Sequence, residues 1–437
     1  MLLGIVACHS YGADDSGTSG GITPDGGAID VAIYVSPDGR DFAEGTKSAP
    51  VATFKRALDI ATSKNAADAV VYPCVASYSE NVVLDRTVHV VGNLSCATWT
   101  ATSERAQIAP PTGVALTIAA PSVVIEDLDV ASTADHTRAG DSAIGVFVVR
   151  AAGVVLRRMK IEASNAIGGE DGDVQENYAA GPAASGGAAN GNTKILGASC
   201  TCIDATSSRG GDGGGLDGSQ PTSGSAMPAV GGDDKGMSGT LCTEGSGGAS
   251  GQQGRDGDPA KTPLSVDESG VRPTSGGEAT NGTPGQGGGG GGSATNMNTV
   301  GASGGCGGCG GGRGTPAKSG GSSIAVLSYS SEVLVDACDL VSAKAGFGGN
   351  GGDGEEGQMG GAGGGSGSAG GCVGGGGGAG GLGGNAGSGA GGHSAGIAYV
   401  GVAPRVQATT ITTGRAGDGG ASKQAAPSGK QMDTLEL

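Results

Sequence analysis

The chain has 437 residues, of which 96 are glycine and only 3% are aromatic, and its formal net charge is −17. Nucleic-acid binding depends on Lys and Arg side chains that neutralise phosphates, so an acidic chain without a basic run is not expected to bind nucleic acid. The glycine content leaves apolar residues for a core in only part of the chain, which excludes a large conventional core.

The N-terminus reads "MLLGIVAC" and resembles the end of a bacterial lipoprotein signal peptide, with Cys8 as the lipid acceptor. Residues 9–30 are polar and low in complexity, as expected of a tether between an anchor and a folded domain. We therefore expect an exported protein, attached to the outer or cell membrane through lipid on Cys8. The alternative is a plain hydrophobic N-terminus, because no basic residue precedes the short apolar stretch.

Residues 33–61, "IYVSPDGRDFAEGTKSAPVATFKRALDIA", begin the folded part of the chain. Phe54, Ala57, Leu58 and Ala61 recur at helical spacing and predict an amphipathic helix. The stretch resembles the N-terminal motif "VSPxGxDxxxGTxxxPxxTxxxAL" of bacterial right-handed parallel β-helix proteins, a pectate-lyase-like group that includes a domain of unknown function. The resemblance implies a coil of short strands closed at its N-terminal end by a strand and a capping helix.

Short strands rich in Val and Ile follow, with no long helical periods between them, which excludes alternating β and α units and leaves a sandwich, a barrel or a solenoid. Internal repetition favours the solenoid. Matching apolar positions recur 31 residues apart: Val123, Ile125, Leu128 and Val130 match Val154, Leu156, Met159 and Ile161. After a gap the same unit continues at Ile324, Val333, Val335 and Leu340, and a weaker copy begins at Ser394.

The sequence therefore predicts an all-β fold, a right-handed parallel β-helix with glycine-rich insertions between its turns. The predicted boundaries are 31–166 for cap and coil, 167–320 for an insertion, 321–345 for one turn, 346–393 for a second insertion, 394–420 for the last turn and 421–437 for a polar tail. The insertions lack the strict period and the proline of collagen. Flexible coil and packed, polyglycine II-like chains both remain open, and cysteines within the insertions favour packed chains.

Nine cysteines besides Cys8 are expected to form disulfides in an oxidising compartment, and the odd number leaves one over. They are Cys74, Cys96, Cys200, Cys202, Cys242, Cys306, Cys309, Cys338 and Cys372. Cys74 and Cys96 are one solenoid turn apart and are expected to pair. Cys372 is expected to pair with the earlier insertion, with "CGGC" (306–309) as the candidate. Zinc binding by "CTC" and "CGGC" is the alternative for those four thiols.

Charged residues on neighbouring copies of the repeat are the candidate chemistry. They are Glu126, Asp127 and Asp129 on one copy and Arg157, Arg158 and Lys160 on the next. The repeat places Asp127 over Arg158 and Asp129 over Lys160. Such pairs could act as the acid and base of a polysaccharide lyase or hydrolase, or could simply join adjacent strands by charge. We favour charge pairing, because sugar clefts use aromatic platforms and this chain has few aromatics. His9, His89, His136 and His393 are expected on the surface or in loops.

"GGNGGDGEE" (348–356) matches the first six positions of a calcium-binding nonapeptide, but it does not recur in tandem. Asp353, Glu355 and Glu356 are the calcium candidates, and we expect neither a metal site nor a cofactor. The resulting hypothesis is a non-enzymatic surface or extracellular structural or interaction protein. Its expected partners are the membrane, further copies of itself, or a cell-surface glycan or protein. The alternative is a polysaccharide-active enzyme on the same scaffold.

Overall fold

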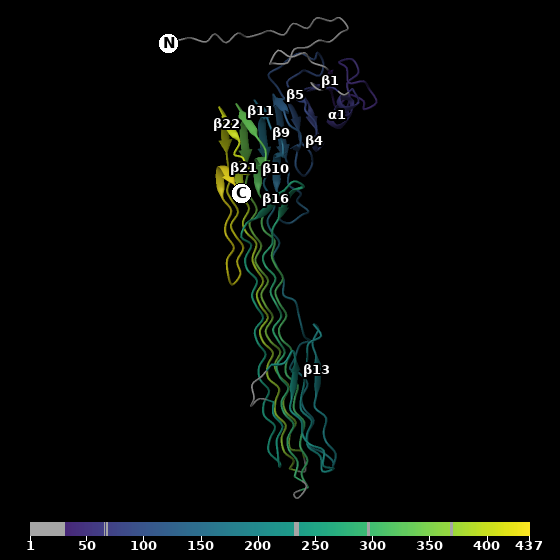
Figure 1. Cartoon of the computed structure of the whole chain (residues 1–437), viewed down its shortest axis with the longest axis vertical. Helices are drawn as coiled ribbons and strands as arrows, with labels where there is room; N and C mark the ends of the chain where they lie inside the picture. Colours follow the sequence, from purple (N-terminus) through teal and green to yellow (C-terminus); the bar gives the residue numbers. More distant parts are fainter. Residues whose placement is uncertain (1–30, 65, 67–68, 231–235, 295–297, 368–369) are drawn as a thin grey trace, which may run out of the picture.

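The computed structural model describes residues 31–64, 66, 69–230, 236–294, 298–367 and 370–437. Cys8, His9 and the predicted tether 9–30 lie outside these residues. The described chain is nearly all-β and has three sheets of parallel strands, from which a long glycine-rich arm extends (Figure 1). The prediction of an all-β fold with parallel sheets is confirmed.

Each sheet is built from strands that follow one another in chain order. The first contains β1 (Val31–Val35), β2 (Ala69–Pro73), β5 (His89–Val91), β8 (Val124–Glu126), β11 (Val154–Arg157), β19 (Val333–Asp336) and β22 (Arg405–Gln407). The second contains β3 (Ser77–Tyr78), β6 (Ala106–Ile108), β9 (Leu128–Ser132), β12 (Lys160–Ala163), β20 (Asp339–Ser342) and β23 (Thr410–Thr412). The third contains β4 (Val82–Leu84), β7 (Leu116–Ile118), β10 (Ala143–Val149), β18 (Ser323–Tyr329), β21 (Ser394–Val400) and β24 (Gln431–Glu436). The chain visits the three sheets in turn, and we call this body the coil.

The core of the coil is a set of aliphatic ladders that run across the strands. Val90, Ile125, Leu156 and Val335 are paired in register on four successive strands, and each is at most 1% exposed. Stacking them removes each side chain from water, which is worth about 1.5–3 kcal/mol per large aliphatic residue. The predicted 31-residue register is therefore confirmed, including the step across the first insertion.

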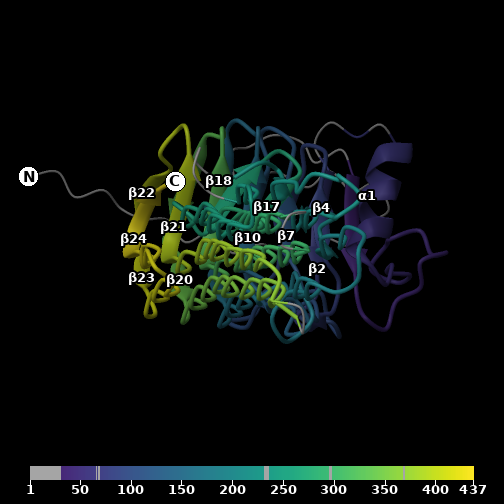
Figure 2. The same cartoon turned by 90° about the horizontal axis from the view of Figure 1, so that it is seen from below.

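Residues of the N-terminal motif stabilise the backbone around α1 (Phe54–Ser63), the one helix in the described residues. The side chain of Thr53 caps its first turn, and Asp41 accepts the backbone N–H groups of Ala52 and Thr53 at 2.9 and 3.1 Å. Gly45 has a φ of 75°, which favours glycine. Figure 2 shows α1 at the N-terminal end of the coil.

All three long excursions leave the coil at one corner, between the second and third sheets. They are residues 164–322, 343–393 and 413–430, and we call their described residues the stalk (Figure 1). The first also carries two small antiparallel sheets. These are β13 (Ser199–Thr201), β14 (Ser207–Arg209) and β15 (Ser225–Met227), and β16 (Leu264–Asp267) with β17 (Gly270–Pro273).

The predicted polar tail is wrong. Residues 421–437 contain β24, which pairs in parallel with β21, and Leu435 is only 3% exposed. The last turn therefore runs beyond 420 and has its own insertion at 413–430. "QMDTLE" has one β-branched residue and two acidic ones, so its sequence does not resemble a strand, and pairing with β21 overrides that preference.

Candidate functional site

The stalk is held together by backbone hydrogen bonds that recur at every third residue. The N–H groups of Gly305, Gly308 and Gly311 donate to carbonyl oxygens of 375, 378 and 381 at 2.8–3.0 Å. Three residues per turn is the period of extended glycine chains. The glycine-rich insertions are thus packed chains, and 371–392 of the second insertion is hydrogen-bonded to its neighbours along its length.

Residues 301–315 form the central chain of the stalk. It also bonds to 282–288 and to 358–361, so neighbours surround it. A Cβ added at Gly308 would lie 1.8 Å from the carbonyl oxygen of Gln358, and one at Gly310 would lie 1.9 Å from that of Gly282. Glycine is therefore required here for close approach of backbones rather than for flexibility.

Three disulfides join parts of the stalk. Cys200–Cys306 and Cys202–Cys309 tie β13 and the residue that follows it to the central chain, with Cα atoms 6.1 and 5.7 Å apart. Cys242–Cys372 joins the first insertion to the second. The prediction that Cys372 pairs with a cysteine of "CGGC" is wrong, because Cys306 and Cys309 both bond to the cysteines of "CTC". The same pairing contradicts the zinc alternative.

In the coil, Cys74 and Cys96 form the predicted disulfide, with Cα atoms 4.8 Å apart. Cys338 is the one unpaired cysteine among those described, and it is buried, which raises the pKa of its thiol. A buried neutral thiol is a poor nucleophile, so Cys338 acts as a small apolar residue of the core. Four disulfides are typical of an oxidising, exported environment.

The candidate catalytic residues meet where strands of the first sheet turn into strands of the second, and we call this place the charged corner. Arg158 Nε lies 2.8 Å from Asp127 Oδ1, as the repeat predicted. Asp129 is in register with Lys160, but its carboxylate pairs with Arg105 at 3.0 Å. The predicted placement of Asp129 over Lys160 is confirmed, and the Lys160 backbone N–H donates to Asp129 Oδ1 at 3.2 Å. The Lys160 ammonium contacts Glu162 at 2.7 Å.

Glu126 lies at the centre of this cluster with its side chain 7% exposed. Arg157 Nη1 and Arg158 Nη2 lie 2.8 and 3.1 Å from its two oxygens, and His89 Nε2 lies 3.8 Å away. His89 and the two guanidiniums lower its pKa to about 2, against the effect of burial. A general base needs a pKa nearer the working pH, so the geometry is that of a closed ion network.

Two histidines differ from the expectation of surface or loop positions, whereas His136 is exposed as expected. His89 lies on β5 and is half-buried. His393 is buried just before β21, where its Nδ1 accepts the backbone N–H of Lys430 at 3.0 Å. Burial and the nearby Lys430 charge lower the pKa of His393 to about 4. Both residues support packing between turns.

The calcium candidates do not converge. Glu355 Oε2 accepts hydrogen bonds from the backbone N–H groups of Asn177 and Gly312 at 2.8 and 2.9 Å, so it stabilises the stalk backbone. Asp353 and Glu356 are exposed. Within the part of the chain that the structure describes, no group of three His, Cys, Asp or Glu side chains is placed to hold a metal ion.

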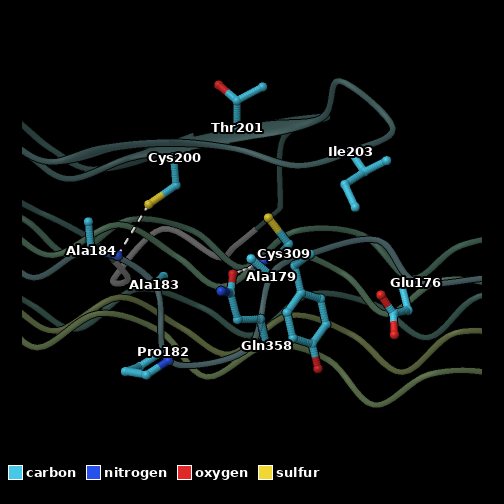
Figure 3. Close-up of a pocket in the computed structure, with 11 residues that line it drawn as sticks. Glu176, Ala179, Pro182, Ala183, Ala184, Cys200, Thr201, Ile203, Cys309 and Gln358 are labelled. Atoms are coloured by element: carbon cyan, nitrogen blue, oxygen red, sulfur yellow. Dashed lines mark hydrogen bonds between the residues drawn. The ribbon is translucent and has the colours of Figure 1, made fainter.

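A hollow of about 540 Å³ lies beside the two β13 disulfides (Figure 3). Residues 176–184 line one side and 200–203 the other, with Gln358 between them. A second hollow of about 330 Å³ shares Glu176 and Ile203 with the first. We call the two together the stalk groove. Sequence reasoning missed it; the isolated Tyr178 in a glycine-rich stretch between cysteines was the available signal.

Comparison with protein-family models, with curated proteins and with solved structures gives no match. Among the described residues, no helix has the length and apolarity needed to cross a lipid bilayer.

Proposed function

We propose that this protein is a non-enzymatic structural or interaction protein of the cell surface, anchored by lipid on Cys8. A right-handed parallel β-helix carries a stiff, polyglycine II-like stalk, whose far end is held away from the coil. The N-terminal motif and the lipoprotein-like first residues support this arrangement, and parallel strand crossovers are right-handed in nearly all proteins.

The observation that carries the proposal is the bonding of the central chain of the stalk. Its backbone bonds to neighbouring segments on several sides, among them 282–288, 358–361 and 375–381. Two disulfides attach it to Cys200 and Cys202, and its glycines have no room for a side chain. At about 3.1 Å per residue, chains of about 20 residues reach roughly 60 Å from the coil. A glycine-rich segment that served only as a linker would need none of these contacts.

The charged corner favours this function over a polysaccharide-active enzyme. Glu126, Asp127 and Asp129 each have an arginine partner, so all three carboxylates are held in ion pairs. Burial raises the pKa of Asp129, against the opposing effect of Arg105. The Tyr34 ring stacks on Tyr72 and contacts the edge of Trp99.

Fractionation of cells tests the anchor. The full chain, expressed in a host that lipidates exported proteins, is expected in the membrane fraction and sensitive to protease added to intact cells. Cys8→Ser should release it into the soluble fraction, with Cys338→Ser as the matched control that stays in the membrane. An intact mass that shows an unmodified, uncleaved N-terminus would contradict the lipid anchor.

A further inference from the structure

We propose that the stalk groove binds an extended peptide segment by a lysine or arginine side chain, with its cationic head at Glu176 and its aliphatic stem along Tyr178. The inference names a partner class for the proposed interaction function and rests on that function. It concerns only the groove and does not involve the charged corner of the coil.

The walls of the groove suit an aliphatic stem. Ala179 and Pro182 line one side of the larger hollow, and Ile203 on the other side is 70% exposed (Figure 3). Tyr178 also lines this hollow. Long basic side chains bury their methylene groups on apolar surfaces while their charged heads stay at the rim. The larger hollow, about 540 Å³, has ample room for one such side chain.

The charge comes from Glu176, which lies where the two hollows meet. No ion pair joins it to another described side chain, whereas Asp204, the other carboxylate that lines the hollows, has partners. Glu355 accepts two backbone N–H groups, and Asp204 accepts from Thr206 and Asn281. Glu176 is therefore the carboxylate that the groove presents to a ligand. The net charge of −17 further favours approach of a cation.

Tyr178 adds a second attraction for the cation. Its hydroxyl donates to the carbonyl oxygen of Glu356 at 2.8 Å, which fixes the ring in the hollow. A cation beside a tyrosine ring gains about 0.5–1 kcal/mol at an exposed site. The two β13 disulfides hold the opposite wall, so little ordering is needed on binding.

The smaller hollow suits the peptide backbone. Gln175, Asn177 and Asn281 line it. Asn177 and Asn281 already donate and accept within the stalk, and the Gln175 oxygen accepts from Arg313. The exposed amide NH2 of Gln175 is the group that can donate to a peptide carbonyl. The two hollows follow one another along the stalk, so an extended segment fits better than a compact ligand. A glycan is disfavoured, because one half-buried ring does not make a stacking platform.

The test uses the oxidised full chain and the peptide acetyl-Gly-Gly-Lys-Gly-Gly-amide, with the Kd measured by ligand-observed NMR. We expect the Lys peptide to bind at least about tenfold more tightly than the same peptide with Gln in place of Lys. Glu176→Gln should weaken the Lys peptide by about tenfold and leave the Gln peptide unchanged, as expected for loss of one charged contact. Tyr178→Ala should weaken the Lys peptide, and Tyr178→Phe should not.

Glu244→Gln is the matched control, because it removes one exposed stalk carboxylate outside the groove. Equal weakening by Glu176→Gln and Glu244→Gln would show general charge attraction and overturn the proposal. Equal affinity for the Lys and Gln peptides, or no binding of either, would also overturn it. Small-angle scattering of the same samples separates the two proposals. An extended stalk without peptide binding overturns only the proposal about the stalk groove, and a collapsed stalk contradicts the proposed function.

Discussion

Glu126 is a buried carboxylate kept ionised by its neighbours, and this makes the stability of the coil depend on pH. Its pKa falls from 4.5 to about 2 on folding. The network therefore stabilises the folded state fully above about pH 4.5, and this contribution is lost as pH falls toward 2. By the size of the shift it is at most about 3 kcal/mol.

We predict that Glu126→Gln lowers the free energy of unfolding at pH 7 by about 2–3 kcal/mol and makes the fall in stability between pH 4.5 and 2 smaller by the contribution of Glu126. Denaturant titrations at pH 7, 4 and 2.5 measure both effects. Asp59→Asn is the control, because its pair with Lys55 is exposed and should be worth less than about 1 kcal/mol. An unchanged pH dependence in the Gln variant would contradict the closed network.

His393 gives a separate pH window. Its pKa falls from 6.5 to about 4 because the buried ring resists protonation. The neutral ring stabilises the fold above pH 6.5, and that contribution is lost as pH falls toward 4. We predict that amide exchange in 413–430, corrected for intrinsic rate, speeds up from pH 7 to pH 5. His393→Asn, which keeps an acceptor but does not titrate, should remove that acceleration.

At this scale, the sequence predicts contacts wherever the repeat sets the register. Asp127 and Arg158 lie 31 residues apart, so their pairing follows from the repeat itself. Arg105 ends the irregular stretch 92–105, whose path the repeat does not encode, and its contact with Asp129 was missed for that reason. The stalk groove was missed for the same reason, because it forms only where β13 lies beside a chain segment about 100 residues later in the sequence.

The extended glycine chain is the element that departs most from ordinary secondary structure, and neighbouring glycines in it are not equivalent. A Cβ at Gly377 would lie 1.9 Å from the carbonyl oxygen of Cys306, whereas at Gly376 the nearest atom is 3.6 Å away. We predict that Gly377→Ala lowers the melting temperature by several degrees. Gly376→Ala should leave it unchanged or raise it slightly, because the unfolded chain loses freedom.

Differential scanning calorimetry of the two variants gives the comparison, and each is the other's control. Equal effects would show that the steric environment does not decide which glycines are needed.

In "GGAGGLGGN" (377–385) every third residue is not glycine, and Ala379 and Leu382 are exposed. This period could have predicted which glycines face neighbours. It could not have predicted which chains are neighbours, because chains without side chains carry little information about register.

At the scale of the whole molecule, the two long insertions form one body. The central chain, 301–315, belongs to the first insertion but bonds to residues 355–364 and 375–384 of the second. Ala386 donates to the carbonyl oxygen of Gly352 at 2.9 Å, so removal of 353–385 joins two adjacent points. We predict that this deletion greatly accelerates amide exchange in 301–315 and leaves β10 and β18 protected. Unchanged exchange in the central chain would show that the first insertion is independent.

The place of the central chain in the order of synthesis has a kinetic consequence. Gly305 bonds to Gly375, which is made 70 residues later, so the centre of the stalk stays open until nearly the whole chain exists. Contacts this distant in sequence are slow to form, because a long loop must close before any bond compensates. Cys242–Cys372 should then form last of the four disulfides during oxidative refolding, as pulsed alkylation would show. A protein built in this way completes its stalk only when nearly the whole chain is available, with that disulfide as the mark of a finished molecule.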